Sequence, residues 1–431
     1  MSSSAPQVPS VHHALRSLRH RNYRLFFGGQ LISLIGTWMQ NVAQSWLVYR
    51  LTGSEALLGL VGFAGLIPVF LFAPFGGAIA DRADRRRVLI GTQTASLLAA
   101  LVLALLTLLG TVTVWHVVVT AVAFGIVNAV DIPTRQAFVP SLVEETDLAN
   151  AIALNSSMFN GARIVGPAVA GVVLAAVGEG WCFAANAVSF LAVILGLALM
   201  KVPVHVPDRQ PLSTMARIAE GFRYAWEKAP IRALLLLLGF VSLTGMPYAV
   251  LMPVFADRIL HGGARALGLL MAASGCGALA GAFLLASKRG LRGLGRWIAI
   301  AAAGFGASLI LFSLSRTLWL SIGLLVPVGF TMIVQMASSN TLVQSMVPDK
   351  LRGRVMSVYS MMFLGMAPFG SLLAGALAER FGAPTTVAAG GAVCVVAAAL
   401  FARRLPAIRE EGRRLVESSR RGGAPSHNPA P

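Results

Sequence analysis

The sequence predicts an all-α integral membrane protein in which about twelve transmembrane helices form two parallel repeats of six. Three observations predict this fold: an apolar composition, regularly spaced apolar windows and an internal repeat. The chain is 56% hydrophobic and 12% charged, with a mean hydropathy of +0.74, whereas roughly a quarter of the residues in a soluble protein are charged. A helix crosses the ~30 Å hydrocarbon layer with about 20 apolar residues, so 431 residues hold twelve spans and short loops.

The first apolar window begins at Leu25, directly after a segment with four arginines, Arg16, Arg19, Arg21 and Arg24. This window is too long for the apolar core of a cleaved signal peptide, so we expect it to be retained as the first span. Turn residues and charges separate the later windows. The predicted spans are 24–49, 57–80, 88–110, 113–132, 153–177, 182–200, 232–256, 266–286, 296–314, 317–338, 354–378 and 384–402.

The distribution of basic residues predicts the orientation of these spans. With twelve spans both termini lie on one side, and 29 of the 35 lysines and arginines belong to loops and span ends on that side. Basic loops stay in the cytoplasm, so the sequence predicts a multi-pass protein of the bacterial cytoplasmic (inner) membrane with both termini cytoplasmic. The net charge of +18 then indicates contact with membrane lipids and not with nucleic acid, because the basic residues form no folded module with interleaved aromatics.

The connection between the sixth and seventh spans divides the chain into halves. It begins with prolines and charges, and the residues Met215, Ile218, Phe222 and Trp226 then follow at helical spacing, which is typical of an amphipathic helix on a membrane surface. The tail after Ala402 is basic and contains glycine and proline, so we expect it to be disordered. The predicted units are a cytoplasmic N-terminal segment (1–23), a six-helix bundle (24–200), a cytoplasmic linker (201–231), a second six-helix bundle (232–402) and a basic cytoplasmic tail (403–431).

The two halves are related in sequence at a constant offset of 204 residues. Because six spans is an even number, both copies have the same membrane orientation, which is the parallel repeat of one large class of secondary transporters. Binding and alternating access are then expected at the interface between the halves. The offset aligns Val139, Ser141, Val143, Met158, Phe159, Gly161, Gly166, Gly171 and Gly178 with Val343, Ser345, Val347, Met362, Phe363, Gly365, Gly370, Gly375 and Gly382.

The loop between the second and third spans reads Gly-x-x-x-Asp-Arg-x-Asp-Arg-Arg. It resembles the signature Gly-x-x-x-Asp-Arg-x-Gly-Arg-Arg of the major facilitator superfamily, and the matching residues are Gly77, Asp81, Arg82, Arg85 and Arg86. The resemblance extends over essentially residues 15–405 and implies the major facilitator fold. A glycine permits close approach of another helix, and an aspartate can pair with an arginine or cap a neighbouring helix. We therefore expect a breakable latch at the cytoplasmic gate.

This motif is not repeated in the second half. The offset places Leu285 at the position of Asp81, so the second copy lacks the carboxylate. Asp84 replaces the glycine of the family pattern, which is a mild departure because Asp tolerates a left-handed turn. We expect the gate chemistry in the first half, and the alternative is that the arginines only set topology by binding lipid headgroups.

Span 5 contains the sequence Gly166-Pro167-Ala-Val-Ala-Gly171, which resembles the Gly-Pro-x-x-Gly-Gly antiporter motif of the superfamily's exporters. Small residues permit tight helix contact, and the proline is expected to bend the helix at mid-membrane. The alternative is generic packing. Together with residues 131–140, Asn155 and Asn160, this segment resembles the drug and siderophore exporters of the superfamily, the group that includes macrolide and enterobactin export proteins.

Arg163 is the one basic residue well inside a predicted span. A charge within the membrane indicates a functional site and requires a partner. Asp131 and Asp81 are the candidate partners for a structural ion pair near the cytoplasmic gate. The alternative is direct contact between Arg163 and an anionic substrate.

Span 1 carries a polar stripe that points to a cavity. Gln30, Ser33, Thr37, Asn41 and Gln44 follow one another at steps of three and four, which is one face of a helix. Polar groups in a membrane must face protein or a water-filled cavity. Because the first helix of the resembled family lines the central cavity, the predicted substrate cavity consists of Thr37, Asn41, Gln44, Asn160, Arg163, Tyr248, Gln335 and Tyr359. The alternative for the stripe is hydrogen bonding between helices alone.

Proton coupling requires an acid or histidine whose pKa changes between states, and the spans supply few of these. Asp131 is the preferred candidate, because it lies at a helix end near the core with Arg135 four residues later; a local salt bridge without a transport role is the alternative. The sequence has no phosphate-binding loop of the Gly-x-x-x-x-Gly-Lys-Ser/Thr type, which argues against ATP hydrolysis. The three cysteines lie far apart in apolar runs, which argues against zinc and disulfides. We expect no cofactor and no metal.

The sequence therefore predicts a secondary active transporter and not an enzyme. It exports an amphipathic or hydrophobic small molecule, drug-like or siderophore-like, by proton antiport with alternating access, and it acts as a monomer. Export rests on the resemblance. One alternative is uptake or facilitated transport of a polar solute. A second, from another class, is a non-transporting membrane receptor or scaffold, although no folded output domain follows the last span.

Overall fold

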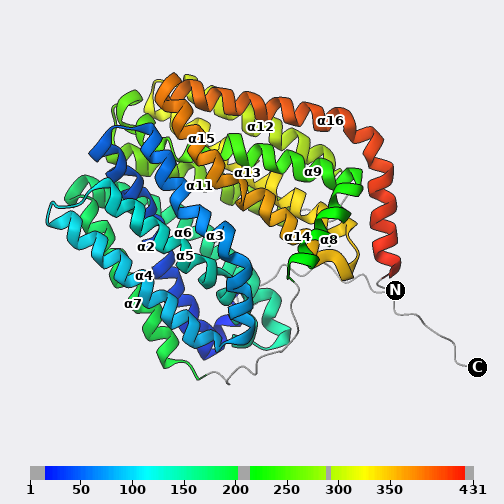
Figure 1. The fold of residues 1–431 in the computed structure, drawn as a ribbon, viewed down its shortest axis with the longest axis horizontal. Helices are drawn as coiled ribbons and strands as arrows, with labels where there is room; N and C mark the ends of the chain where they lie inside the picture. Colours follow the sequence, from blue (N-terminus) through cyan, green and yellow to red (C-terminus); the bar gives the residue numbers. More distant parts are fainter. Residues whose placement is uncertain (1–14, 202–213, 288–292, 423–431) are drawn as a thin grey trace, which may run out of the picture.

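The computed structural model describes residues 15–201, 214–287 and 293–422. These residues form a helical protein with two bundles, one from each half of the chain (Figure 1). The N-terminal bundle is coloured blue to green in Figure 1, and the C-terminal bundle green to red. The two bundles lie side by side, as the predicted repeat requires.

The N-terminal bundle consists of six long helices joined by short connections. Helix ends follow the local sequence: the Ser54 hydroxyl accepts a hydrogen bond from the backbone N–H of Leu57, and Gly53 and Gly178 take positive φ values of 61° and 86° between consecutive helices. The helices are α2 (Arg21–Thr52), α3 (Glu55–Arg82), α4 (Arg85–Leu108), α5 (Val114–Phe138), α6 (Leu148–Val177) and α7 (Glu179–Leu199), with short turns at η1 (Arg16–Arg19), η2 (Val139–Leu142) and η3 (Glu145–Asp147).

The C-terminal bundle repeats this order with two interrupted spans. The first combines α9 (Ala229–Phe240), the π-helix η4 (Val241–Gly245), η5 (Met246–Ala249), α10 (Met252–Val254) and the π-helix η6 (Phe255–Ile259). Then follow α11 (Gly263–Ser287), α12 (Leu294–Leu314), α13 (Leu318–Met346), the pair α14 (Asp349–Leu364) and α15 (Met366–Phe381), and α16 (Ala383–Gly422). Pro247 and Pro253 lie in the first interrupted span, where they remove backbone donors.

The helices account for twelve membrane crossings. Eleven helical stretches in the described residues are long and apolar enough to span a membrane. α2 has 32 residues and packs against α6 and α7; its polar stripe makes it less apolar, and we count it as the twelfth. Large apolar side chains such as Leu98, Val188 and Ile300 are more than half exposed, as expected for surfaces that contact lipid.

Two ends of the molecule can be defined from the direction of these helices. α2, α4 and α6 begin at one end, where α3, α5 and α7 finish. We call this the terminal end, and the opposite one the distal end. The arginine-rich connection between α3 and α4 lies at the terminal end, which is the end predicted to be cytoplasmic.

The internal repeat is visible in helix contacts. Gly171 on α6 packs against Gly268 on α11, and its repeat partner Gly375 on α15 packs against Gly59 on α3. Gly178 and Gly382, also repeat partners, both have positive φ, 86° and 83°. The matched glycines therefore occupy equivalent places in the two copies.

The linker and tail form helices at the terminal end. α8 (Thr214–Glu227) packs against α14, and an ion pair joins Glu220 to Arg354. Residues 202–213 of the linker lie outside the described residues. The prediction of a disordered tail from residue 403 is wrong for residues 403–422, because α16 continues as a helix to Gly422.

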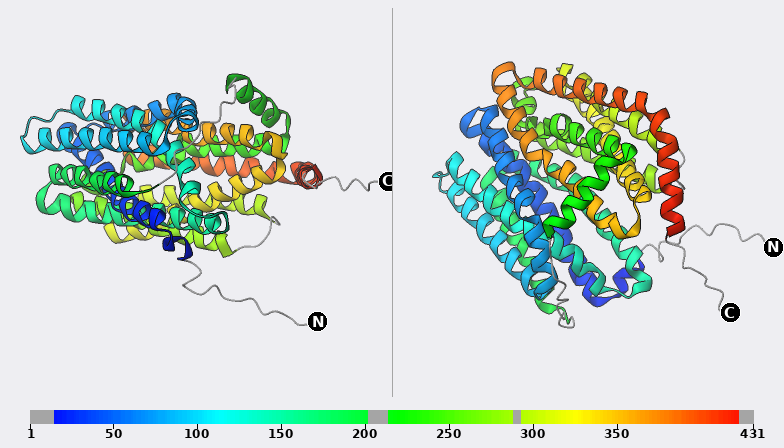
Figure 2. Two further views of the ribbon diagram at one scale, coloured as in Figure 1. Left: turned by 90° about the horizontal axis from the view of Figure 1, so that it is seen from below. Right: turned by 45° about the vertical axis from the view of Figure 1, so that its right-hand side comes forward.

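Apolar contacts explain why the tail is ordered. Leu405, Ile408 and Leu415 pack against the core of the C-terminal half, and an i,i+4 ion pair of 2.7 Å joins Glu410 to Arg414 on the exposed side. Figures 1 and 2 show that α16 bends as it leaves the bundle, and Pro406 lies within this helix. Residues 423–431 of the predicted tail lie outside the described residues.

Candidate substrate cavity and gates

Two pairs of helices make most of the contact between the halves, α3 with α15 and α6 with α11. Both seams depend on small residues: a side-chain carbon at Gly59 would lie 2.9 Å from the Cα of Gly375, and one at Gly268 would lie 2.6 Å from the Cα of Gly171. Close backbone approach of this kind is how membrane helices gain packing energy. The tight contacts lie in the distal part of the four helices.

Polar bonds close the distal end between the halves. Arg258 Nη1 lies 2.7 Å from Glu55 Oε1, and the carboxylate of Glu55 is 6% exposed. On α15, Glu379 Oε2 accepts hydrogen bonds of 3.0 Å from the Ser54 hydroxyl and from the backbone N–H of Ala56. A carboxylate at a helix N-terminus is favourable because it meets free N–H groups and the positive end of the helix dipole. We call Ser54, Glu55, Arg258 and Glu379 the distal latch.

The terminal end is open between the halves. Phe70 of α3 contacts the other half, since its ring lies 6.3 Å from that of Phe369. Beyond it, Phe72, Phe75 and Ile79 are 44%, 65% and 42% exposed. The ribbons of the two halves also diverge toward this end in Figure 1. The structure is therefore a terminal-open, distal-closed state.

Two arginines of the gate motif tie the N-terminal bundle together. Arg85 donates to the carbonyl of Ala137 at 2.9 Å, and Arg86 donates to the carbonyls of Leu197 and Ala198 at 2.6 and 2.7 Å. These acceptors lie at the C-terminal ends of α5 and α7, where carbonyls lack helical partners and the dipole favours a cation. Asp84 caps α4 by accepting from the backbone N–H of Arg86.

The other members of the gate motif are free in this state. Asp81 and Arg82 are exposed at the end of α3, and neither has a hydrogen bond or ion pair with the part of the chain that the structure describes. Gly77, expected at a close helix contact, has open space where a side chain would be. The preceding residue, Gly76, makes that contact, because a side-chain carbon there would collide with the carbonyl of Ala129 on α5.

The antiporter-like motif lets α6 pack against one helix from each half. Gly166 lies against α2, where a side chain would come within 2.9 Å of the Ile35 carbonyl, and Gly171 lies against Gly268 of α11. Pro167 is buried, and its carbonyl lies at the same contact. α6 continues through this proline as one helix; the interrupted backbone lies in the seventh span.

Arg163 does not pair with either predicted acid. Its guanidinium Nη2 lies 3.9 Å from the sulfur of Met332 on α13, and its Cζ lies 5.8 Å from the ring centroid of Trp38. Among the described residues it has no carboxylate partner. Asp131 is occupied elsewhere and Asp81 is exposed at the terminal end, so the predicted ion pair is wrong for this state.

Asp131 is held within the N-terminal bundle. Its Oδ1 accepts hydrogen bonds from Thr92 Oγ1 at 2.8 Å and Gln93 Nε2 at 2.9 Å, both on α4. Arg135 Nε lies 3.8 Å from Oδ2. The residue is 4% exposed, so the carboxylate is buried in the bundle and lies between two helices.

The polar stripe of α2 divides into a packed part and an open part. Gln30 and Ser33 are buried. Thr37 and Gln44 are half-buried and Asn41 is exposed, and these three have no hydrogen bond within the described residues. They are therefore free to contact water or a solute, as the cavity prediction requires.

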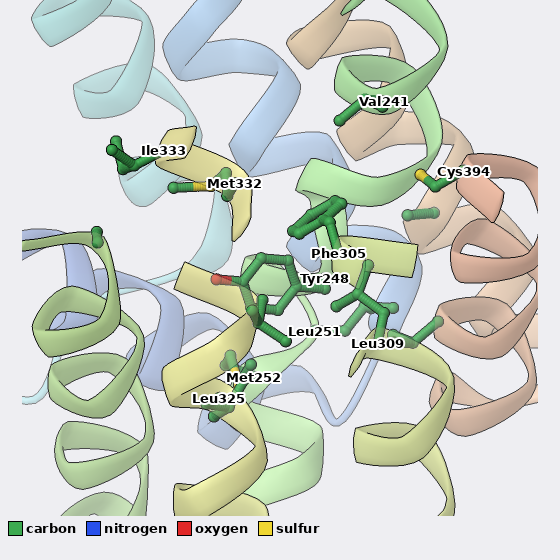
Figure 3. Close-up of a cluster of buried hydrophobic side chains, with 14 of the residues drawn as sticks. Val241, Tyr248, Leu251, Met252, Phe305, Leu309, Leu325, Met332, Ile333 and Cys394 are labelled. Carbon is green, nitrogen blue, oxygen red and sulfur yellow. The ribbon is translucent and has the colours of Figure 1, made fainter. Parts of the chain in front are cut away.

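The remaining predicted cavity residues are more enclosed. Asn160 donates to the Ser156 carbonyl of its own helix at 2.8 Å. Tyr248 and Tyr359 are 6% and 4% exposed; the first bonds Ser274 at 2.7 Å and the second the Met336 carbonyl at 2.8 Å. Figure 3 shows Tyr248 beside Phe305 and Leu251, with its hydroxyl pointing away from Phe305. Gln335 is buried, and its Nε2 has no partner in the described structure.

Two features of this region were not predicted from the sequence. The first is the irregular seventh span, for which Pro247 and Pro253 were the available signal; π-helical turns of this kind often accompany functional sites. The second is the distal latch, whose acids and arginine belong to loops and helix ends that carry no motif.

Comparison with known proteins shows the family. A family model described as transmembrane secretion effector, a branch of the major facilitators, matches residues 12–421. The chain belongs to the major facilitator superfamily. This confirms the predicted superfamily and the all-helical membrane fold, and it makes the protein a transporter and not an enzyme.

Several transporters of this superfamily are similar over nearly their whole length. The staphyloferrin A transporter of Staphylococcus aureus is 29% identical over 88% of this chain and 96% of its own. The multidrug efflux pump Tap of Mycolicibacterium fortuitum is 28% identical, over 81% and 88% of the two chains. Macrolide efflux protein A of Streptococcus pyogenes is 26% identical, over 84% and 92%.

Solved structures confirm the major facilitator fold. An inward-facing bacterial homologue of the human lysosomal transporter Spinster matches 95% of this chain and 99% of its own, with a TM-score of 0.66 and 16% identity. A POT family transporter in complex with a thioalcohol-conjugated peptide matches 92% and 99%, with a TM-score of 0.74 and 12% identity. At these identities the similarity concerns the fold.

Proposed function

We propose that this major facilitator exports an amphipathic or hydrophobic small molecule, drug-like or siderophore-like, across the bacterial cytoplasmic membrane. The observation that carries the proposal is the terminal-open state, in which the halves separate at the arginine-rich end. If that end is cytoplasmic, as the positive-inside rule predicts, the free polar side chains of α2 receive solutes from the cytoplasm. The relatives named as efflux pumps support the same direction.

The chemistry of the cavity supports an amphipathic solute. Trp38 and Phe159 form an edge-to-face pair with ring centroids 5.8 Å apart, and Phe159 is 44% exposed. Thr37 and Asn41, which belong to the same helix as Trp38, add neutral polar groups. A polar solute with many charges would require several charged partners, whereas Arg163 is the one charged residue at this depth among the residues that the structure describes.

We propose proton antiport as the driving reaction, with Asp131 as the residue that exchanges the proton. This carboxylate is buried between α4 and α5, and Thr92 and Gln93 of α4 donate hydrogen bonds to it, so a change in the packing of the two helices changes the bonds that hold it. Both seams lie within one chain, so one cavity needs no second copy and we expect a monomer.

The proposal is tested by measuring how much of a panel of dyes, antibiotics and iron chelators accumulates in cells with and without the protein. We expect lower accumulation of at least one amphipathic compound when the protein is present, and loss of this difference when a protonophore collapses the proton gradient. An unchanged panel contradicts export. Efflux that persists without the gradient contradicts antiport and leaves export intact.

A further inference from the structure

Arg163 is a cation without a counter-charge among the described residues, and it lies in a helix that is long and apolar enough to span the membrane. It lies near the middle of α6 (Leu148–Val177), at the depth where the α6–α11 seam ends: a side chain at Gly275 of α11 would lie 3.1 Å from the Arg163 carbonyl. An arginine at this depth is costly unless a counter-charge or water meets it. No acid of the described chain does so.

The neighbours of Arg163 hold the guanidinium without neutralising it. Trp38 presents its ring face at 5.8 Å, which is a cation–π contact, and Met332 presents its sulfur at 3.9 Å. Trp38 belongs to the N-terminal half and Met332 to the C-terminal half. The five N–H donors of the guanidinium therefore lie between the halves with few acceptors, in an apolar and aromatic setting.

A second unpaired donor lies on α13, in the other half. Gln335 is 2% exposed, and its Nε2 has no hydrogen-bond partner in the described structure. It is three residues after Met332 on α13, so the two side chains occupy one face of that helix. A buried donor without a partner is costly, and here it belongs to the helix face that presents Met332 to the guanidinium.

We propose that Arg163 and Gln335 bind the carboxylate of the transported molecule, which makes the substrate an amphipathic organic anion. This inference rests on the proposed function and names its substrate class. A carboxylate accepts two parallel hydrogen bonds from a guanidinium, and its second oxygen can accept the amide of Gln335. The Trp38–Phe159 pair then contacts the apolar body of the same molecule. Because the two donors come from opposite halves, the bound anion draws the halves together.

The test uses purified full-length protein and one matched pair of ligands. The probe is pyrenebutyrate, a fluorescent aromatic carboxylate, and its comparison is the neutral primary amide of the same acid. We expect the wild type to bind the acid at least tenfold more tightly than the amide. Arg163→Gln should weaken binding of the acid by about tenfold to a hundredfold, the range for hydrogen bonds to charged groups, and leave the amide within about twofold.

Two further variants separate the effect of charge from that of fold. Arg163→Lys keeps the charge but not the planar fork, so its loss of acid affinity should be smaller than that of Arg163→Gln. The control is Arg316→Gln, which removes a guanidinium that donates to the Ser313 and Ser315 carbonyls of its own segment at 2.9 and 3.1 Å. It should leave the affinities for both ligands unchanged.

The melting temperature without ligand gives an independent readout. Replacing an arginine that stabilises the fold lowers the melting temperature. Removing an uncompensated charge leaves the melting temperature unchanged or raises it. If Arg163→Gln does not fold, the arginine is structural in this sense, and the acid-to-amide ratios of the wild type and Arg163→Lys then decide whether it also binds anions.

Several outcomes overturn the inference. The first is that the wild type binds the acid and the amide with equal affinity. The second is that Arg163→Gln weakens the binding of both ligands equally. The third is that the site binds only inorganic phosphate and sulfate. The binding assay does not depend on the direction of transport. Acid binding through Arg163 without cellular efflux contradicts the proposed function alone, and efflux that Arg163→Gln leaves unchanged contradicts this inference alone.

Discussion

At Gly268 the backbones of the two halves are in close contact. A methyl group there would lie 2.6 Å from both the Cα of Gly171 and the carbonyl oxygen of Pro167, which are backbone atoms and cannot rotate away. Gly268→Ala should destabilise the protein by about 1–3 kcal/mol, the usual cost of overpacking, and reduce transport. The measurement is the melting temperature of the purified protein, followed by size-exclusion chromatography.

The matched control for this change is Gly161→Ala on α6, where a side chain meets nothing within 4 Å. Alanine favours a helix over glycine by about 1 kcal/mol, so this variant should be as stable as the wild type or more so. Equal destabilisation by both changes would show that the seam is not the cause.

Asp131 can be tested with a change that keeps its acceptor. Asp131→Asn retains a carbonyl oxygen for Thr92 and Gln93 but cannot carry a charge. We expect it to abolish efflux against a gradient while downhill exchange of substrate continues. The control is Asp257→Asn at an exposed distal position, which should transport like the wild type. Proton-driven efflux by Asp131→Asn would place the coupling on another residue.

At the residue level, the sequence indicates which residues need a special environment in a membrane, but their contacts depend on helix rotation, which the sequence does not give. The sequence showed that Arg163 needs a special environment, but its partners belong to α2 and α13, far along the chain. Gly76 and Gly77 differ by about 100° around one helix. Only the rotation of α3 against α5 decides which of them is packed.

At the scale of helices, the distal latch fixes the closed seam. Replacing Glu55 with Gln removes its charge attraction to Arg258, which is 57% exposed. A partly exposed ion pair contributes about 0.2–1 kcal/mol, so the distal-open population should rise by up to about fivefold. The measurement is the labelling rate of Ser371→Cys, a seam residue that is 3% exposed, by a membrane-impermeant maleimide, with exposed Cys276 replaced by serine.

Arg50→Gln is a suitable control for this labelling. Arg50 forms an ion pair of 2.6 Å with Glu179 at the same end, but both residues belong to the N-terminal half. Its loss should leave the Ser371→Cys labelling rate unchanged. An equal increase in both variants would mean that general loosening, and not the latch, exposes the seam.

Helix positions were predictable to a few residues, because apolar length sets them. The predicted span 182–200 corresponds to Glu179–Leu199, and 232–256 to the helical stretch 229–259. The break in the seventh span and the helical tail were not predictable in this way. Both depend on tertiary contacts: Pro247 lies against Gly370, and Leu405 and Ile408 pack against the core of the C-terminal half.

At the scale of the whole molecule, one helix carries an acid of each gate. α3 has Glu55 at its first residue and Asp81 one residue before its end. A helix rises 1.5 Å per residue, so these carboxylates are about 40 Å apart. In the present state Glu55 is paired and Asp81 is exposed without a partner among the described residues. If α3 moves as a rigid rod, closing one gate opens the other.

Asp81→Asn should therefore shift the molecule in the direction opposite to Glu55→Gln. Asp81 makes no bond in the terminal-open state, so its replacement costs that state nothing and weakens only the terminal-closed state. We expect the labelling rate of Ser371→Cys to fall and that of a terminal reporter, Ile152→Cys at a position 53% exposed, to stay high, while transport slows.

The double variant gives the sharpest form of this prediction. Sites about 40 Å apart contribute additively to an equilibrium, so Glu55→Gln combined with Asp81→Asn should return both labelling rates toward the wild-type values, although neither latch is intact. One contrary result is that the two single changes shift the labelling rates in the same direction, and another is that the double variant shifts them more than either single variant does. Either result would show that α3 does not link the two gates as one rigid element with two positions. The coupling between them would then have to pass through the α6–α11 seam instead.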